Sequence, residues 1–395
     1  MPFRRNRAGG QMLPRFRAWR ELHRAVSTLP ESAFLRDHTM TTPANSDTLL
    51  ARGFRMPAEW EPHASTWLAW PHRESDWPGK LEVIPWVYAE IIRALTRHET
   101  VNLIVPDELR ADDATDILSS ANADMGRVKL WELPTDRSWL RDSGPIFVTN
   151  ASGERTALDW RFNAWAKYDN WLYDDRVPAF VAEKLGVPRV QPTHNGHRVV
   201  LEGGSIDVNG AGLLLTTEEC LLSKTQERNP PFGRADYERV FADYLGIKKV
   251  IWLDRGMVGD DTHGHIDDLA RFVNPRTVVT AVESNPADEN YAILQENLQR
   301  LQAATDVHGS KLEVVPLAMP RPLIFEGVRL PVSYANFYIA NGVVIVPTFN
   351  DPADRVALGT LADLFPGREV VGISCVDLVW GLGTLHCMTQ QEPKS

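Results

Sequence analysis

Short runs of β-branched residues alternate with helical patterns from residue 53 onward, and this alternation limits the fold more than any other feature of the sequence. Run length and residue type separate the two states. Strands are predicted at 101–105, 212–217, 250–253, 276–282, 312–315 and 343–346. Helices are predicted at 84–97, 113–121, 177–185, 235–245, 288–304 and 353–364. The alternation indicates a layered α/β fold.

The pair Asn341-Gly342 stands between two apolar runs and predicts a tight hairpin. A plain doubly wound sheet has no such hairpin, so we expect mixed strand pairing. No linker rich in Pro, Ser or Gly divides the body, and residues 49–395 are predicted to form a single domain. Residues 1–48 are set apart as a basic, disordered leader, with Met40 as an alternative start.

Charge is unevenly distributed along the chain. Residues 1–40 hold eight Arg against three acidic residues, a balance of +5, so the other 355 residues carry −15 of the formal total of −10. An acidic body favours a small cationic substrate and disfavours nucleic acid. No segment approaches the ~20 apolar residues of a membrane helix, so we expect no membrane partner.

The three cysteines are few and far apart in the sequence. Their number and spacing argue against a disulfide framework and for a reducing compartment, so we expect a cytoplasmic protein. Cys220 and Cys375 are assigned to packing. Cys387 lies in the segment GLGTLHCMTQQ, where Gly381 and Gly383 allow positive φ and leave space beside a reacting atom. This cysteine is therefore the candidate nucleophile.

Two carboxylates in distant motifs predict the kind of ligand that the site would bind. Asp142 lies in WLRDSGP and Asp267 in GDDTHGHIDD. Guanidinium is a planar cation with several N–H donors, and carboxylates that each accept two hydrogen bonds match it. We expect the two acids to hold such a cation. Trp139, three residues before Asp142, has a spacing that suits a cation–π contact.

A thiolate that attacks the guanidinium carbon needs a proton donor for the departing nitrogen. A histidine held by a carboxylate meets this need, and His265 with Glu202 would supply it. Each acid and the histidine also have a purely structural interpretation. Asp142 would form a surface ion pair with Arg141, Glu202 would close a turn, and His265 would be a core histidine.

A different chemistry is open for the segment HGHIDD at 263–268. Binuclear metallohydrolases gather metal ligands in an H-x-H-x-D pattern, which here would use His263, His265 and Asp267. The position that usually holds a further histidine is Asp268, and no second clear His cluster follows. The pattern is therefore incomplete.

Taken together, the motifs closely resemble those of agmatine deiminases in the guanidino-modifying superfamily. The resemblance runs from residue 53 to residue 393. It rests on GFRMPAEWEPH at 53–63, WLAWP at 67–71, WLRDSGP at 139–145, FNAW at 162–165, EGG at 202–204, GHID at 264–267, SYANF at 333–337 and HCMTQQ at 386–391.

The resemblance implies a pentein α/β propeller, with five pseudo-repeated ββαβ modules around a central active site. It implies a single catalytic domain over residues 49–395. It also implies roles for the site residues. Cys387 would be the nucleophile that forms a covalent amidino intermediate, His265 the acid and then the base, and Glu202 its orienting partner. Asp142 and Asp267 would hold the guanidinium, and Trp139 would line the substrate channel.

The implied reaction is hydrolysis of agmatine to N-carbamoylputrescine and ammonia, in polyamine biosynthesis. The resemblance implies no metal or organic cofactor, a small cationic guanidino substrate, and a homo-oligomer, dimeric or tetrameric. Other guanidino substrates stay open, namely arginine, peptidyl arginine and guanidinobutyrate, as does amidino transfer to an amine. Alternatives of another class are the metallohydrolase above and a binding pentein without enzymatic activity.

Four positions depart from the usual family pattern and leave the preferred substrate open. Leu382 and Thr384 stand where members usually have Gly and Asn before the nucleophile, Ser205 stands where Asn often follows Glu-Gly-Gly, and Ala166 replaces a usual Gly. If position 382 requires a positive φ, its Leu side chain costs ~1 kcal/mol.

Overall fold

The computed structural model describes residues 48–395, so the predicted leader lies outside the described residues except for Thr48. Within the described residues, no helix has the length and apolar character needed to cross a membrane. Strands and helices alternate as predicted, and the sheets combine parallel and antiparallel pairing. The expected α/β class is therefore confirmed.

Five sheets of the described residues share one connectivity. In each, the first strand pairs antiparallel with the second, the second pairs parallel with the third, and a helix lies between the second and third along the chain. Four of these sheets use consecutive strands, and the fifth joins the chain end to the first strand. A parallel pair needs a crossover connection, which the intervening helix provides.

The four sheets of consecutive strands are as follows. They are β4 (Ile146–Thr149), β5 (Arg155–Leu158) and β6 (Arg189–Val190) with α5 (Val177–Leu185); β9 (Asp207–Val208), β10 (Leu213–Thr217) and β11 (Lys249–Leu253) with α7 (Arg234–Leu245); β12 (Ala270–Phe272), β13 (Thr277–Val282) and β14 (Glu313–Ala318) with α8 (Asn290–Ala303); and β17 (Tyr338–Ile339), β18 (Val343–Thr348) and β19 (Glu369–Ser374) with α9 (Pro352–Leu364).

The fifth sheet closes the described chain on itself. It comprises β20 (Gln390–Pro393), β1 (His63–Ala69) and β2 (Thr100–Val105) with α2 (Ile84–Thr96), and it adds β3 (Val128–Glu132) after α3 (Glu108–Ser120). Pairing of β20 with β1 places the segment before β20 near the start of the described chain. Two short hairpins, β7 (Thr193–His194) with β8 (His197–Arg198) and β15 (Ile324–Phe325) with β16 (Val328–Arg329), lie outside these five sheets.

The predicted hairpin at Asn341-Gly342 is confirmed. It joins β17 to β18, and Tyr338 faces Ile345 across the antiparallel pair. The six predicted strands and six predicted helices are all present, with small differences at their ends. The largest difference is in α3, which begins at Glu108 because the Asp107 side chain accepts a hydrogen bond from the Arg110 amide and caps the helix.

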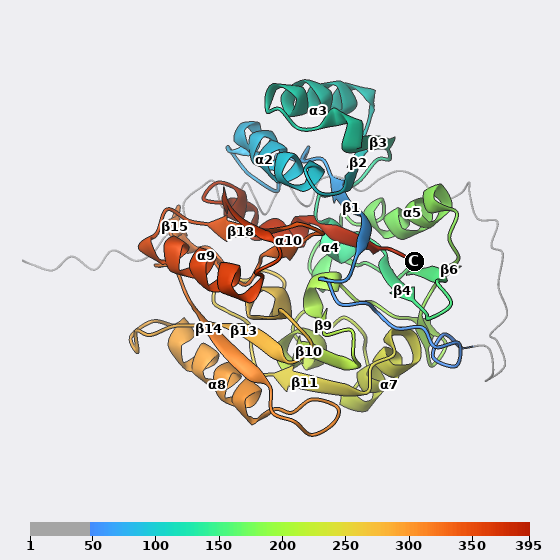
Figure 1. Ribbon diagram of the computed structural model, residues 1–395, viewed down its shortest axis with the longest axis vertical. Coiled ribbons are helices and arrows are strands. Elements are labelled where there is room, and N and C mark those ends of the chain that lie inside the picture. The colour runs from blue at the N-terminus through green and yellow to red at the C-terminus, as the bar shows by residue number, and fades with distance from the viewer. Residues whose placement is uncertain (1–47) are drawn as a thin grey trace, which may run out of the picture. The chain divides into compact units, whose positions relative to one another are not determined.

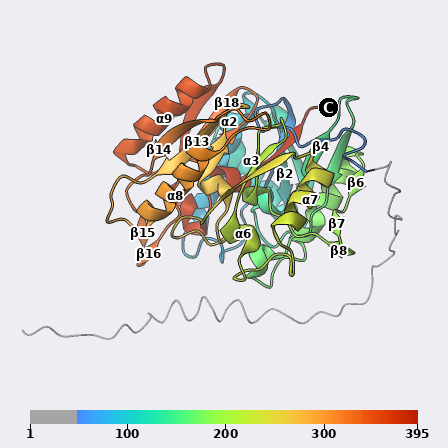
Figure 2. The same ribbon diagram turned by 90° about the horizontal axis from the view of Figure 1, so that it is seen from below.

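Two one-turn helices, α4 (Leu140–Ser143) and α10 (Leu385–Met388), contact one another. Figure 1 shows them near the middle of the described residues, with α2, α9, α8, α7 and α5 following one another around the outside. In the view from below, α8 and α9 lie on the opposite side of the molecule from β4 and β6 (Figure 2). Large apolar side chains, among them Trp67, Trp77 and Tyr338, are fully buried between these elements.

Candidate active site

Each of the five sheets is preceded along the chain by a short segment that contributes a polar side chain to one buried cluster. Asp142 precedes β4, Glu202 precedes β9, Asp267 precedes β12, Asn336 precedes β17 and Cys387 precedes β20. All are less than one tenth exposed. The shared connectivity therefore brings together residues that are far apart in the sequence.

The Cys387 thiol lies among hydrogen-bond donors and acids. Its Sγ lies 3.1 Å from Asn336 Nδ2 and 3.6 Å from Asp267 Oδ2. Burial, followed by the charges of Asp267, Asp268 and Asp142, raises the pKa of Cys387 well above its usual range, although the Asn336 amide opposes this. These effects favour the protonated thiol over the thiolate.

The glycines before Cys387 serve one of their two predicted purposes, which is to leave space and not to adopt a positive φ. The positive φ of this segment belongs to Leu382, at 69°, and not to either glycine. Gly381 and Gly383 are required for space, because a Cβ at these positions would lie 2.5 Å from Trp77 Nε1 and 2.6 Å from Trp139 Cζ3. A Cβ at Gly383 would also come within 3.2 Å of the Cys387 sulfur.

His265 lies at the centre of the acids, fully buried, at the start of the 3-10 turn Ile266–Asp268. Its Nδ1 is 3.8 Å from Asp142 Oδ1 and 4.0 Å from Asp267 Oδ1, and its Nε2 is 3.9 Å from Glu202 Oε2. Burial disfavours the charged ring. Asp142 above all, then Cys220 and Glu202, nevertheless raise the pKa of His265 well above its ordinary value.

Glu202 holds the far side of His265 as an ionised group. Its Oε1 accepts a hydrogen bond of 2.9 Å from Arg228 Nε, and both side chains are fully buried. Burial would raise its pKa, but Arg228 and His265 together lower the pKa of Glu202 to about 2. A permanent carboxylate beside the ring favours the protonated imidazole.

Asp142 is fixed by two donors. Gly204 N donates to its Oδ1 at 3.0 Å and Trp165 Nε1 donates to its Oδ2 at 2.9 Å. Burial, with the charges of Asp267 and Glu202, raises the pKa of Asp142 to about 6 against the opposing effect of His265. Gly204 has to be glycine here, since a Cβ would lie 2.5 Å from His265 Nδ1.

Asp267 is held by a chain of buried groups that continues behind it. His386 joins it to Glu59, with Nδ1 2.7 Å from Asp267 Oδ2 and Nε2 2.8 Å from Glu59 Oε2. Glu59 in turn pairs with Arg271 and Arg141. Burial alone would raise the pKa of Asp267, but the contact with His386 is the largest of the effects that lower it below its usual value. Its second oxygen, Oδ1, has no hydrogen-bond partner among the described residues.

Trp139 lies against the turn that carries Cys387. Its ring packs at a tilt of 33° against Trp77 with centroids 5.4 Å apart, and it is only 5% exposed. The same ring covers Gly383, beside the Cys387 sulfur. Trp139 is therefore in place to form a wall of the cluster.

The structural interpretations of Asp142 and His265 do not fit the contacts, whereas Glu202 does close a turn, since its carbonyl accepts from Ser205 N. Arg141 turns away from Asp142 and reaches Glu59 and Gln391, so the two neighbours form no ion pair. Both ring nitrogens of His265 lack a hydrogen bond from any described residue, which is not the environment of a satisfied core histidine.

His263 is not part of this cluster. Its Nε2 lies 3.0 Å from Ser223 Oγ and its Nδ1 lies 4.0 Å from Glu219, on a backbone with φ of 67°. Within residues 48–395, the one group with the spacing of metal ligands comprises Glu202, Cys220 and His265. The ligand set of the metallohydrolase alternative is therefore not assembled.

The four departures from the family pattern fall into two pairs: two residues have a positive φ, and two have side chains that form hydrogen bonds near the cluster. Leu382 does adopt the positive φ that makes its side chain costly, and Ala166 follows two further residues in a left-handed turn at φ of 52°. The Thr384 hydroxyl donates to Asn336 Oδ1 at 2.7 Å, and the Ser205 hydroxyl donates to the carbonyl of Glu202 at 2.6 Å. Two of these side chains thus steady neighbours of the cluster.

Sequence reasoning assigned no role to several residues that hold the site together. They are Glu59, Trp165, Arg228, Asp268 and Asn336. Asn336 could have been found from its motif, because SYANF comes directly before a predicted hairpin. Arg228 lies in no apolar or glycine-rich pattern and gave no signal.

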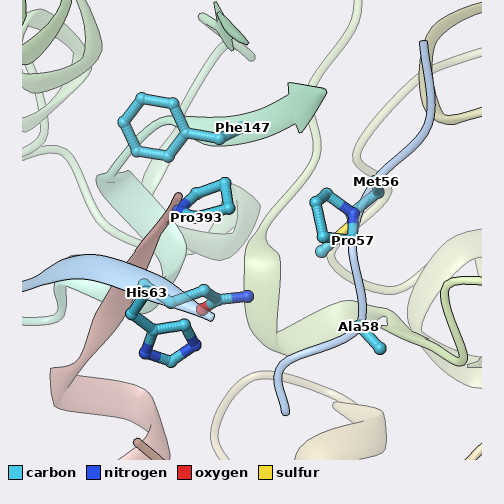
Figure 3. Close-up of a pocket in the computed structure, with 7 residues that line it drawn as sticks. Met56, Pro57, Ala58, His63, Phe147 and Pro393 are labelled. Atoms are coloured by element: carbon cyan, nitrogen blue, oxygen red, sulfur yellow. The ribbon is translucent and has the colours of Figure 1, made fainter. Parts of the chain in front are cut away.

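A small cavity lies apart from the cluster. It encloses about 10 Å³, room for about one water molecule. Figure 3 shows His63 and Pro393 on one side of it and Met56 and Pro57 on the other. It contains no residue of the cluster around Cys387 and is too small for a substrate.

Comparison with known proteins shows the family of this chain. Residues 55–393 match the model of the Porphyromonas-type peptidyl-arginine deiminase family. The chain is 37% identical over 377 residues to the agmatine deiminase of Pseudomonas aeruginosa strain LESB58, covering 90% of this chain and 99% of that one.

Solved structures give the same result. The agmatine deiminase of Enterococcus faecalis matches with a TM-score of 0.80 and 33% identity, over 90% of this chain and 100% of that one. A substrate-bound agmatine deiminase of C. jejuni matches with a TM-score of 0.77 and 28% identity, over 92% and 99%.

The fold and the Cys, His and carboxylate cluster define an enzyme of the deiminase class. The chain belongs to the Porphyromonas-type peptidyl-arginine deiminase family, and the resemblance to agmatine deiminases is confirmed.

Proposed function

We propose that this protein hydrolyses agmatine to N-carbamoylputrescine and ammonia through a covalent intermediate on Cys387. The observation that carries the proposal is the convergence of Cys387, His265 and three carboxylates in one buried cluster, in which the His265 ring nitrogens have no hydrogen-bond partner among residues 48–395. The agmatine deiminases of similar sequence support the choice of substrate. Agmatine is a dication, which suits an acidic cluster.

In the first step, Asp142 and Asp267 accept hydrogen bonds from the planar guanidinium. Its positive charge offsets the acids that raise the pKa of Cys387, so the thiol releases its proton to solvent and the thiolate forms beside its target. The sulfur attacks the guanidinium carbon. His265, charged through its acidic neighbours, donates a proton to the departing nitrogen, and ammonia leaves.

In the second step, the now neutral His265 takes a proton from water, which attacks the same carbon. Collapse of this adduct breaks the bond to sulfur and releases the ureido product. Glu202, fixed by Arg228, keeps the ring oriented through both proton transfers. Trp139 lines the channel that leads to the sulfur.

Several wider features belong to the same proposal. The repeated connectivity of five sheets supports a five-fold pentein propeller around the cluster. We further propose a single catalytic domain over residues 49–395, a homo-oligomer, a cytoplasmic location and a role in polyamine biosynthesis.

A substrate panel tests the function. Ammonia and ureido product would be measured for agmatine, arginine, a peptidyl arginine and guanidinobutyrate, with and without an added amine as acceptor. We expect hydrolysis of agmatine with the highest kcat/KM. Preference for arginine or peptidyl arginine, or transfer to the amine, would overturn the assignment.

A chelator tests the chemistry. Activity should survive removal of metal ions. Loss of activity that added metal restores would favour the alternative that uses His263, His265 and Asp267.

A further inference from the structure

A second cysteine lies directly behind the proposed proton-transfer residue. Cys220 is on the short helix α6 (Glu218–Leu222) and is 1% exposed. Its Sγ, one ring nitrogen of His265 and one carboxylate oxygen of Glu202 all lie within 4.8 Å of one another. This thiol is separate from the nucleophile, which is Cys387.

Two of these three groups have free coordinating atoms. Both ring nitrogens of His265 and Oε2 of Glu202 are buried and have no hydrogen-bond partner among residues 48–395. Buried polar atoms are almost always paired, so an unpaired ring nitrogen and an unpaired carboxylate oxygen beside one thiol indicate a ligand. The other oxygen of Glu202 is already held by Arg228, which fixes the direction of the carboxylate.

The chemistry of the three groups selects the ligand. Sulfur, imidazole nitrogen and carboxylate oxygen are the donors that zinc and related thiophilic cations prefer. The surrounding charge also favours a cation. Asp142 and Asp267 lie 3.8 and 4.0 Å from His265 Nδ1, so two further acids flank the group, and Arg228 is the cation that pairs with Glu202.

We propose that Glu202, Cys220 and His265 form an inhibitory binding site for a thiophilic divalent cation such as Zn²⁺. On binding, three coordinate bonds form, and the thiol proton of Cys220 and any proton on the coordinating ring nitrogen pass to solvent. No oxidation or reduction is involved. Binding depends only on these three side chains, whereas inhibition rests on the role proposed above for His265.

The inhibition follows from the position of the histidine. A ring nitrogen bound to a metal cannot accept or release a proton, and the pull of the cation lowers the basicity of the other nitrogen. His265 would then be fixed between Glu202 and Cys220 and withdrawn from proton transfer. The Cys387 thiol would be untouched.

Spectroscopy tests binding without any need for activity. Full-length Cys387→Ser protein, freed of metal by a chelator, would be titrated with Co²⁺. We expect a thiolate-to-cobalt charge-transfer band that saturates near one equivalent. The band should be absent from the Cys387→Ser/Cys220→Ser double variant and kept in Cys387→Ser/Cys375→Ser, since Cys375 is buried elsewhere in the core. A band that survives loss of Cys220, or no band in Cys387→Ser, would overturn the site.

Activity tests inhibition. Zn²⁺ should inhibit the wild-type enzyme, and a chelator should restore the rate. In Cys220→Ser, the half-inhibitory Zn²⁺ concentration, relative to that variant's own metal-free rate, should rise at least about tenfold, since even groups that only support metal ligands change affinity by 10- to 100-fold. Cys375→Ser should keep the wild-type value. Equal sensitivity in Cys220→Ser would place the inhibitory metal at Cys387 and overturn the proposal.

Discussion

The sulfur of Cys387 lies 3.6 Å from Oδ2 of Asp267, a carboxylate that is itself bound to His386. An acid this close to a thiol opposes formation of the thiolate, which is the reactive form. The site therefore holds the proposed nucleophile in its less reactive, protonated form. A substrate that carries a positive charge would relieve this repulsion.

The state of the thiol can be measured by alkylation. Because burial and nearby acids raise the pKa of Cys387, neutral iodoacetamide should modify it slowly at pH 7, and the rate should keep rising above the ordinary thiol pKa of about 8.5. A chloroacetamidine, which is a planar cation, should react faster than iodoacetamide by a larger ratio than it does with a free thiol. The same ratio for enzyme and free thiol would contradict substrate-assisted activation.

Replacement of the nucleophile gives the second prediction. Cys387→Ser should keep the fold and lose activity by several orders of magnitude, because a serine hydroxyl in this acidic cluster has no adjacent base to ionise it. In the wild-type enzyme, mass spectrometry of quenched turnover should place the amidino adduct on Cys387 alone. An adduct on Cys220 or Cys375, or wild-type activity in the serine variant, would remove Cys387 from the mechanism.

Much of the fold was predictable because inner strands such as β10, β13 and β18 are buried on both faces and read as apolar runs. β20 could not be found in this way, since its sequence is QQEP and its side chains are buried by polar partners. The site residues lie in glycine-rich motifs that the resemblance covers. Their convergence was not predictable from spacing, because it depends on pairing between β20 and β1 at opposite ends of the described chain.

The supports of the site were harder to foresee than its reactive groups. Arg228 pairs with Glu202 across 26 positions in a segment without a pattern, and Glu59 meets His386 across 327. Long-range polar pairs leave no periodic signal in a single sequence. Leu382 differs from these pairs, because its deviation from the family glycine marked a local feature in the sequence. The turn does require a positive φ at this position, so the predicted cost of a Leu side chain applies.

The buried ion pair behind His265 gives the third prediction, on stability. Glu202→Gln leaves Arg228 buried without a countercharge and should lower the free energy of unfolding at pH 7 by about 3 to 5 kcal/mol. The control Glu154→Gln removes an exposed partner of Arg52 and should cost no more than about 1 kcal/mol. Urea unfolding would measure both.

The pH dependence of this pair has a fixed sign. The folded pKa of Glu202, about 2, lies below the unfolded value of about 4.3. Its contribution to stability is therefore complete above the unfolded pKa and is lost as the pH falls from about 4 toward 2. Glu202→Gln should remove this part of the acid sensitivity. A Glu202→Gln variant as stable as wild type at pH 7 would contradict a buried ion pair between Glu202 and Arg228.

The acids proposed to hold the guanidinium give the last prediction. Asp142→Asn and Asp267→Asn each replace an acceptor oxygen with a donor that faces guanidinium N–H groups. Each should lower kcat/KM roughly 100-fold or more, because a charge-assisted bond is lost from a buried site. This corresponds to about 3 kcal/mol of lost transition-state stabilisation. The control Asp113→Asn breaks an exposed pair with Arg110 and should leave kcat/KM unchanged.

Because the pKa of Asp142 is about 6, wild-type kcat/KM should fall below that pH as the acid becomes protonated. The effect on stability has the opposite sign. The folded pKa of Asp142 lies above its unfolded value of about 3.9, so the stability that this carboxyl contributes is lost as the pH rises from about 4 to 6. At pH 7, the substrate-free Asp142→Asn protein should therefore melt at or above the wild-type temperature. Near-wild-type kcat/KM in either variant would exclude that acid from substrate binding.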